Sequence, residues 1–273
     1  MYPYVHLLGK DISSYMLTAA TGFVALLIIA WLITRRRNDI DQTQILHISL
    51  ASMGGAVIGA HLLYGIVNFR VLIIAAKDGF SQIHSFLEMT ELIGSVFGGM
   101  VFYGGLAGGI VGTLWYLKTM KMPLSPYLDI MSFCIPLFHG FARIGCFLGG
   151  CCYGIESEFG LEYHNAILVS ANGVRRFPVQ LLESSCNFIL FGFLLVMFQK
   201  NRLSNRLIYI YLILYSIIRF FDEFLRGDAI RGHIGALSTS QFISVIVLIV
   251  STGVLIKSAH SKTSHTYSNP KKV

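Results

Sequence analysis

Residues 136–150 read PLFHGFARIGCFLGG and residues 207–228 read LIYIYLILYSIIRFFDEFLRGD, and both stretches are apolar enough to lie in a lipid bilayer. Among the charged residues within them, Arg143, Arg219 and Glu223 lie where a bilayer should disfavour charge. A guanidinium group at the middle of a bilayer costs at least about 3 kcal/mol, so such residues usually face a polar cavity or a charged partner. Two cations and one anion inside a bundle favour a pocket for an anionic group, with a lipid phosphate as the first candidate.

The composition of the whole chain indicates a membrane protein. Of its 273 residues, 54% are hydrophobic and 13% are charged, and the mean hydropathy is +0.65. A water-soluble domain carries about 25% charged residues. The sequence shows no alternating strand pattern of the kind that a transmembrane barrel requires. We therefore predict an all-α integral membrane protein, for which this length is enough to form a single bundle.

Apolar runs of about 20 residues predict seven transmembrane helices. Their approximate spans are 15–34, 44–66, 97–117, 127–147, 179–199, 207–226 and 240–257. Basic residues concentrate in alternate connections, such as Arg35 to Arg37 and Lys200 to Arg206, which become cytoplasmic under the positive-inside rule. The N-terminus is then outside and the C-terminus inside. The net charge of +7 serves this orientation, and we expect no nucleic-acid partner.

The same pattern predicts one transmembrane domain over residues 1–258 and a disordered cytoplasmic tail over residues 259–273. Two outer segments form a predicted head at the outer leaflet. Residues 71–92 mix apolar and charged side chains, as in a short helix lying in the membrane interface. Residues 154–178 form the longest polar connection, and this side is the expected route for a substrate.

The third predicted helix is rich in glycine. Its small residues have the spacing that lets a neighbouring helix approach closely, which is the favoured interpretation. They are Gly94, Gly98, Gly104, Gly108 and Gly112. Tyr103 is followed by Gly104 and Gly105, so its phenol could also point into a cavity.

The segment around Arg143 is the most distinctive one. His139 and Arg143 are four residues apart and share one helix face. Glycines at 145, 149, 150 and 154 predict that the helix breaks near the outer surface. A broken helix at membrane depth is tolerated where it lines a cavity or is buried in protein.

Residues 142–154, ARIGCFLGGCCYG, resemble the Gly-Arg-x-Gly-Asn-Phe-x-Asn-x-Glu-x-x-Gly signature of the phosphatidylglycerol–prolipoprotein diacylglyceryl transferases. Further blocks are similar to that family in the same order along the chain. They are Ser14-Tyr15 with Gly22-Phe23, residues 98–105 (GGMVFYGG), 176–183 (RFPVQLLE), 219–226 (RFFDEFLR) and 237–241 (LSTSQ).

The resemblance implies a transferase of the bacterial cytoplasmic (inner) membrane. It would move a diacylglyceryl unit from phosphatidylglycerol to the thiol of a lipobox cysteine at the outer leaflet, releasing glycerol phosphate. It would act on a prolipoprotein signal peptide within the lipid bilayer, and we expect a monomer. Arg143 and Arg219 would stabilise the charge that grows on the phosphate, since a guanidinium fork suits phosphate and stays charged in a dry site.

The other matched positions receive supporting roles. Glu223 lies one turn after Arg219 and is expected to orient and neutralise it, with proton transfer as the alternative. Tyr15, Gly104 and Gln180 match family positions and are expected at the substrate site. Arg226 is either a second phosphate contact or an interfacial anchor, and the anchor is favoured.

The chain departs from the family where the acceptor thiol must lose its proton. The family's histidine, proposed as its base, is Tyr103 here, and two asparagines and a glutamate are Cys146, Gly149 and Cys151. A phenol has an ordinary pKa near 10, so Tyr103 needs a cationic neighbour such as Arg143 to act as a base, and otherwise donates a hydrogen bond.

Two histidines are weighed as further candidates. His61 is a spare base candidate within the second predicted helix, although a structural hydrogen bond is favoured for it. His139 is interpreted as structural by the same reasoning.

The cysteines leave three interpretations open. Cys146, Cys151 and Cys152 cluster on the predicted outer side, where a disulfide is feasible and favoured. A nucleophilic or acyl-carrying thiol comes next. A metal site is the weakest, because no pair of histidines at ligand spacing accompanies them. We accordingly expect no metal and no cofactor, and we place Cys134 and Cys186 in the core.

Two other functions compete with this one. A related lipid-dependent transferase could use a different thiol, peptide or glycan as acceptor. A non-catalytic lipid-binding protein or transporter could keep the arginine pocket without chemistry. A transporter would favour inverted repeats with paired broken helices, and the sequence contains one such helix and no internal repeat. The enzyme is therefore favoured.

Overall fold

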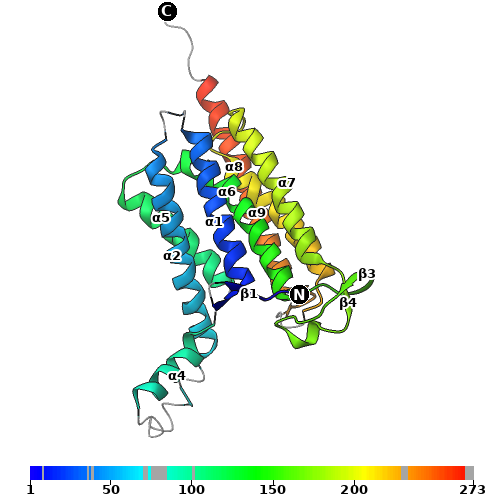
Figure 1. Cartoon of the computed structure of the whole chain (residues 1–273). Helices are drawn as coiled ribbons and strands as arrows, with labels where there is room; N and C mark the ends of the chain where they lie inside the picture. Colours follow the sequence, from blue (N-terminus) through cyan, green and yellow to red (C-terminus); the bar gives the residue numbers. More distant parts are fainter. Residues whose placement is uncertain are drawn as a thin grey trace, which may run out of the picture. The chain divides into compact units, whose positions relative to one another are not determined.

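The computed structural model describes the chain except residues 8, 36, 38–39, 70–72, 75–84, 100–101, 229–232 and 268–273. The described residues are mainly helical, with three small antiparallel sheets of two strands each. They form two compact units. The first joins Met1–Arg36 to Ser125–Val273, and the second is Arg37–Leu124. Figure 1 shows the helices of each unit.

Long helices dominate the first unit. They are α1 (Ser14–Thr34), α6 (Leu124–Gly149), α7 (Val179–Gln199), α8 (Leu207–Asp222) and α9 (Thr239–Tyr267). The bounds of α7 match the predicted span, and α1 and α6 agree with their spans to within a few residues. The last helix runs to Tyr267, beyond the end near residue 257 that hydropathy predicts, because its polar final turns still form helix.

Helix α6 is the buried helix of this unit. Ile130 and Phe133 are fully buried on it, whereas the apolar side chains of α1, such as Val24 and Ile28, are more than half exposed. Helix α7 packs on α6 through a hydrogen bond from the Ser184 hydroxyl to the Gly140 carbonyl at 2.8 Å. The exposed apolar surface suits lipid, and the buried helix carries Arg143.

The start of α8 is fixed to α6 by one buried carboxylate. Asp129 accepts hydrogen bonds from the backbone N–H of Asn205 at 2.5 Å and of Leu207 at 3.1 Å. These N–H groups lie at the helix start, where they have no partner within the helix. Helix α8 ends at Asp222 and is followed by the short helix η2 (Glu223–Leu225). The helix therefore ends before residue 226, where the sequence predicted its end, because Arg226 pairs with Gly154 in a β-bridge.

The predicted polar connection after α6 folds into a compact lobe. It contains β3 (Glu156–Glu162), η1 (Val169–Ala171) and β4 (Arg175–Arg176), packed over a cluster that includes Tyr153 and Tyr163. Arg176 holds the lobe together, since it donates to the Ser170 carbonyl at 2.9 Å and lies 4.3 Å from the centre of the Tyr153 ring. Two further hairpins pair β1 (Tyr4–Leu7) with β2 (Lys10–Ser13) and β5 (His233–Ile234) with β6 (Leu237–Ser238).

The second unit contains α2 (Gln42–Val67), α4 (Phe86–Phe97) and α5 (Phe102–Thr119). The helix that corresponds to the third predicted span, 97–117, begins at Phe102, later than predicted, because α4 ends at Phe97 and a new helix follows it. The predicted interfacial helix at 71–92 is represented by the start of α4, where Ser85 and Glu88 form a capping box. Residues 71–72 and 75–84 of that segment lie outside the described residues.

Glycines bring α2 and α5 into close contact, as the sequence predicted. A Cβ added at Gly108 would lie 2.1 Å from the Gly55 carbonyl oxygen, and one added at Gly104 would lie 2.2 Å from that of Gly59. Gly112 makes a similar contact with α2. Gly94 does not, because it lies in α4 with nothing within 4 Å of an added Cβ.

The described residues include five helices that are long and apolar enough to cross a membrane. They are Ser14–Thr34, Gln42–Ile66, Leu124–Gly149, Val179–Gln199 and the Thr239–Ser258 part of α9. Their mean hydropathies lie between 1.5 and 2.3. A multi-pass membrane protein follows from them. The additional crossings by α5 and α8, and the orientation of the chain, stay predictions.

The glycine contact gives a prediction about stability. Gly55→Ala should lower the thermal unfolding midpoint of the detergent-solubilised protein, because its methyl group would meet the Gly108 carbonyl oxygen at 2.3 Å. Overpacking of this kind costs about 1–3 kcal/mol. Gly54→Ala is the matched control, since nothing lies within 4 Å of a Cβ at that neighbouring position. Equal midpoints for the two variants would contradict the close contact.

Candidate functional site

The carboxylate of Glu183, on the second turn of α7, is the centre of a buried polar cluster. Its Oε2 lies 2.9 Å from Nη2 of Arg143 and 3.9 Å from Nη1 of Arg226. Its Oε1 accepts a hydrogen bond from the Tyr215 hydroxyl at 3.3 Å and lies 3.5 Å from Nε2 of His139. Glu183 is only 2% exposed. A single carboxylate thus connects α6, α7 and α8 with the segment after α8.

Helical spacing explains how α6 takes part. His139 and Arg143 lie one turn apart and both face Glu183, which confirms that they share a helix face. The His139 ring also packs on that of Tyr215, with 5.4 Å between the ring centres. Breaking a buried ion pair by removing one partner costs about 3–5 kcal/mol, so Arg143 and Glu183 depend on each other.

Arg143 retains unused hydrogen-bonding capacity. The residue is 6% exposed, and its Nη1 donates to Sγ of Cys146 at 3.7 Å. Its Nη2 is ion-paired with Glu183 at 2.9 Å, whereas its Nε has no hydrogen-bond partner among the described residues. Buried donors are normally satisfied by protein, water or a ligand. Arg143 can therefore donate to a bound group.

Arg219 is held by the end of its own helix and by α9. Its Nη2 donates to Glu223 at 2.5 Å and to the Ser240 hydroxyl at 3.1 Å, and its Nη1 donates to Asp222 at 3.4 Å. Glu223 is thus in direct contact with Arg219, one helical turn away, and its orienting role stays a prediction. Arg219 and Arg143 both lie close enough to Glu183 to attract its charge.

Arg226 is buried, with only 3% of its side chain exposed. Its guanidinium donates two hydrogen bonds of 2.9 Å to the carboxylate of Asp228, and its Nη1 points to Glu183. The β-bridge with Gly154 sets its backbone. An interfacial anchor, which the sequence favoured, should be exposed, so burial beside Glu183 supports the alternative of a contact within the site.

Gln180 joins α7 to the loop after α6. Its amide donates to the Cys151 carbonyl at 2.8 Å and accepts from the Tyr163 hydroxyl at 3.0 Å. Both Gln180 and Tyr163 are fully buried, and burial raises the pKa of Tyr163. Gln180, predicted to bind substrate, therefore uses its amide to hold the loop in place.

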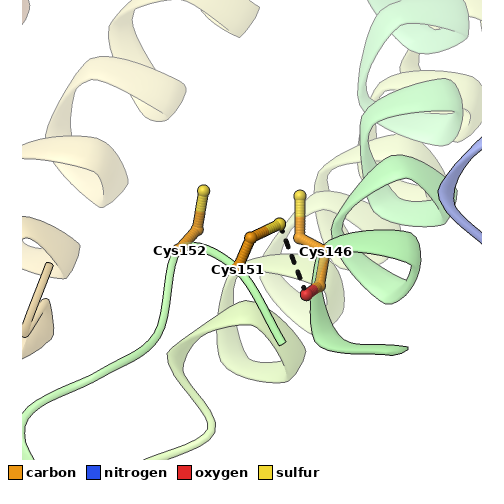
Figure 2. Close-up of side chains that lie close together, drawn as sticks. All are labelled: Cys146, Cys151 and Cys152. Carbon is orange, nitrogen blue, oxygen red and sulfur yellow. Dashed lines mark hydrogen bonds between the residues drawn. The ribbon is translucent and has the colours of Figure 1, made fainter. Parts of the chain in front are cut away.

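The three cysteines that follow one another closely in the sequence lie together at the end of α6 (Figure 2). The sulfur atoms of Cys146, Cys151 and Cys152 all lie within 4.8 Å of one another, and all three are free thiols. The Cys151 thiol donates a hydrogen bond to the Cys146 carbonyl oxygen, with 3.6 Å between the sulfur and the oxygen. Cys134 is buried as predicted, whereas Cys186 is partly exposed.

The remaining predicted site residues are less informative. Tyr15 is 40% exposed and lies beside Gly145 of α6, where an added Cβ would be 2.9 Å from the Tyr15 Cα. In the second unit, the His61 Nδ1 hydrogen-bonds the Phe97 carbonyl at 2.7 Å, which agrees with the favoured structural role. Gly104 packs on α2. The side chain of Tyr103 lies outside the described residues.

Sequence reasoning missed the central residue of the cluster. Glu183 is the only charged residue of the apolar run 179–199, which is the same signal that drew attention to Arg143. Tyr215 and Asp228 could not be found this way, because their roles depend on which helix faces meet.

Comparison with known proteins places this arrangement in a family. The profile of the prolipoprotein diacylglyceryl transferases matches residues 3–257. The phosphatidylglycerol–prolipoprotein diacylglyceryl transferase of Clostridium tetani is 32% identical over 246 residues, covering 89% of this chain and 92% of the relative. Transferase 2 of the same name from Clostridium perfringens is 32% identical over 244 residues, covering 88% and 89%. The Finegoldia magna transferase is 27% identical over 255 residues, covering 93% of each. The chain belongs to the prolipoprotein diacylglyceryl transferase family.

Proposed function

We propose that this transferase moves the diacylglyceryl group of phosphatidylglycerol to the thiol of a lipobox cysteine in a prolipoprotein. The names of the relatives support this donor and this acceptor. The relatives come from bacteria, which supports a place in the bacterial cytoplasmic membrane. We also propose the orientation given by the basic residues, with the lobe after α6 at the outer leaflet, and a monomer.

The observation that carries the proposal is the buried guanidinium of Arg143, whose Nε lacks a hydrogen-bond partner among the described residues. A phosphate ester offers oxygen atoms that accept from such a fork. A dry site increases the effect of the charge, because little water screens it. Arg143 is therefore the group that we assign to the phosphate.

Arg219 and Arg226 would complete the electrostatic environment of the phosphate. Arg219 is partly buried and held by Glu223, and the side chain of Arg226 is buried and held by Asp228. These contacts hold the two cations in place before a lipid binds, so little reorganisation is needed when charge develops. Glu183 does the same for Arg143.

The proposed reaction is a displacement at the glyceryl carbon that carries the phosphate. The acceptor thiol loses its proton, and its sulfur forms the new bond to that carbon. The carbon–oxygen bond to the phosphate breaks, and its electron pair leaves with the phosphate oxygen as glycerol phosphate. The arginines stabilise this leaving group, because charge grows on its oxygen atoms in the transition state.

The activity itself has a direct test. The purified protein, incubated with phosphatidylglycerol and a lipobox peptide, should yield a peptide whose mass has increased by one diacylglyceryl unit. The same peptide with its cysteine replaced by serine should stay unmodified. An adduct on another acceptor, with none on the lipobox peptide, would support a different transferase. No adduct at all would favour a lipid-binding protein without chemistry.

The role of Arg143 is tested with a charge-balanced pair of variants. Arg143→Met alone should be destabilised by about 3–5 kcal/mol, because it leaves Glu183 buried and unpaired. Arg143→Met combined with Glu183→Gln should fold better and still transfer at least about 100-fold more slowly, since a preorganised donor is missing. Initial rates and thermal unfolding midpoints measure both effects. Arg175→Met, on the exposed neighbour of Arg176, is the control that should keep the wild-type rate. A folded double variant with full activity would remove Arg143 from the mechanism.

Tyr103 is proposed to act on the acceptor, as a base or as a hydrogen-bond donor. Its place at the family's histidine motivates a test with Tyr103→Phe, which removes only the hydroxyl. We expect a slower rate at saturating lipid, by about 10-fold or more if it transfers a proton. Tyr4→Phe, at an exposed position, is the control. An unchanged rate would return Tyr103 to helix packing.

A further inference from the structure

The three clustered cysteines come from one short stretch of chain. Cys146 lies on the last turn of α6, which ends at Gly149, and the chain turns back at Gly150, where φ is +70°. The N–H of Cys151 then donates to the Cys146 carbonyl at 3.1 Å. This turn places Cys151 and Cys152 beside the cysteine on the helix (Figure 2).

The turn also directs neighbouring side chains to the same side. Side chains of consecutive residues in an extended chain point in opposite directions. Cys152 has a φ of +55°, a left-handed conformation that costs about 1–2 kcal/mol for a residue other than glycine. Figure 2 shows the sulfur atoms of Cys151 and Cys152 on the same side of the loop as that of Cys146. Backbone strain of this kind concentrates at functional sites.

Buried groups fix the loop in this position. The Gln180 amide holds the Cys151 carbonyl at 2.8 Å, and Tyr163 in turn orients Gln180. On the other side, the Gly227 N–H donates to the carbonyl of Tyr153, the residue after Cys152, at 3.0 Å. Partners that orient the residues supplying ligands are a regular part of metal sites in proteins.

Three thiolates are a suitable donor set for zinc. Zn²⁺ binds cysteine sulfur at about 2.3 Å in tetrahedral geometry, which places two such sulfurs about 3.8 Å apart. The sulfur atoms here lie within 4.8 Å of one another, so small side-chain rotations bring them to that spacing. Three thiolates around Zn²⁺ carry a net charge of −1, and Arg143, whose Nη1 contacts the Cys146 sulfur, lies beside that charge. A zinc ion with three protein ligands keeps a fourth position open.

We propose that Cys146, Cys151 and Cys152 bind one Zn²⁺ ion whose fourth position takes the thiol of the acceptor cysteine. This inference rests on the proposed function. A thiol bound to zinc is deprotonated, and its proton passes to solvent. The zinc-bound sulfur then attacks the glyceryl carbon, and the phosphate leaves with the electron pair of the broken bond. The zinc ion is neither oxidised nor reduced.

The location of the cluster fits this step. Arg143 contacts Cys146 through Nη1 and Glu183 through Nη2, so the cysteines lie directly beside the proposed phosphate site. The zinc-bound acceptor sulfur and the phosphate leaving group would then both lie next to Arg143. The cluster also supplies a way to deprotonate the acceptor in a chain whose matching position carries Tyr103 in place of histidine.

The first test is metal binding by the full-length protein in detergent. Elemental analysis after exposure to Zn²⁺ and removal of excess metal should give one zinc per chain. Co²⁺ used as a probe in place of zinc should give the near-ultraviolet band of thiolate ligation. Cys151→Ser and Cys152→Ser should each weaken Zn²⁺ binding by at least about 10-fold. Replacing a residue that only orients a metal ligand already costs about that much, so loss of a ligand should cost no less. Cys186→Ser, on α7 outside the cluster, should bind Zn²⁺ like the wild type. Binding that survives in both loop variants would overturn the site.

A second measurement needs no variant and so does not depend on folding. Zn²⁺ should protect three thiols of the reduced wild-type protein from a maleimide, and peptide mass spectrometry should identify them as Cys146, Cys151 and Cys152. Equal labelling with and without Zn²⁺ would overturn the proposal. A disulfide between two of the three that persists in the purified protein, with no zinc uptake after its reduction, would overturn it as well.

Activity measurements separate this inference from the proposed function. Removal of zinc should lower the rate of diacylglyceryl transfer to the lipobox peptide, and Zn²⁺ should restore it. Full transfer by the metal-free protein would overturn the role in acceptor activation and leave the proposed function intact. Zinc binding at the three cysteines with no transfer under any metal condition would instead end the proposed function.

Discussion

The buried ion pair between Arg143 and Glu183 is the interaction on which the rest of the site depends. Neither charge can be buried without the other, because an unpaired charge in a low-dielectric interior costs several kcal/mol. The pair fixes α6 against α7, and the contacts of Glu183 with Tyr215 and Arg226 add α8 and the segment that follows it. The core of this unit is therefore built around a charged group, and the position of Arg143 follows from helix packing rather than from a mobile loop.

Much of this could be predicted from the sequence, because local patterns determine it. The span of α7, the pairing of Arg219 with Glu223 and the close approach of α2 and α5 all depend on residues within a few turns of one helix, or on glycine spacing. These patterns follow from the 3.6-residue period of a helix and from the absence of a side chain on glycine. The same period placed His139 and Arg143 on one face.

The parts that the sequence did not predict depend on contacts between distant segments. Glu183 becomes central only when the face of α7 that carries it meets α6. Arg226 becomes buried only because its backbone pairs with Gly154, which also ends α8 early. The three cysteine sulfurs converge because Gly150 and Cys152 both adopt left-handed backbone conformations. Glycine adopts this conformation readily, so position 150 carries a sequence signal for it, whereas a cysteine at position 152 does not.

The two halves of the proposed site are held in place by the protein in different ways. The proposed phosphate half consists of charged side chains that neutralise one another inside the bundle, so replacing one of them leaves a buried charge. The loop with Cys151 and Cys152 is held through its backbone, since Gln180 binds the carbonyl of Cys151 and not its side chain. Side chains at these positions can therefore change without loss of the loop's position. In the proposed mechanism, a change in how the acceptor thiol is activated is therefore physically easier than a change in how the phosphate is held.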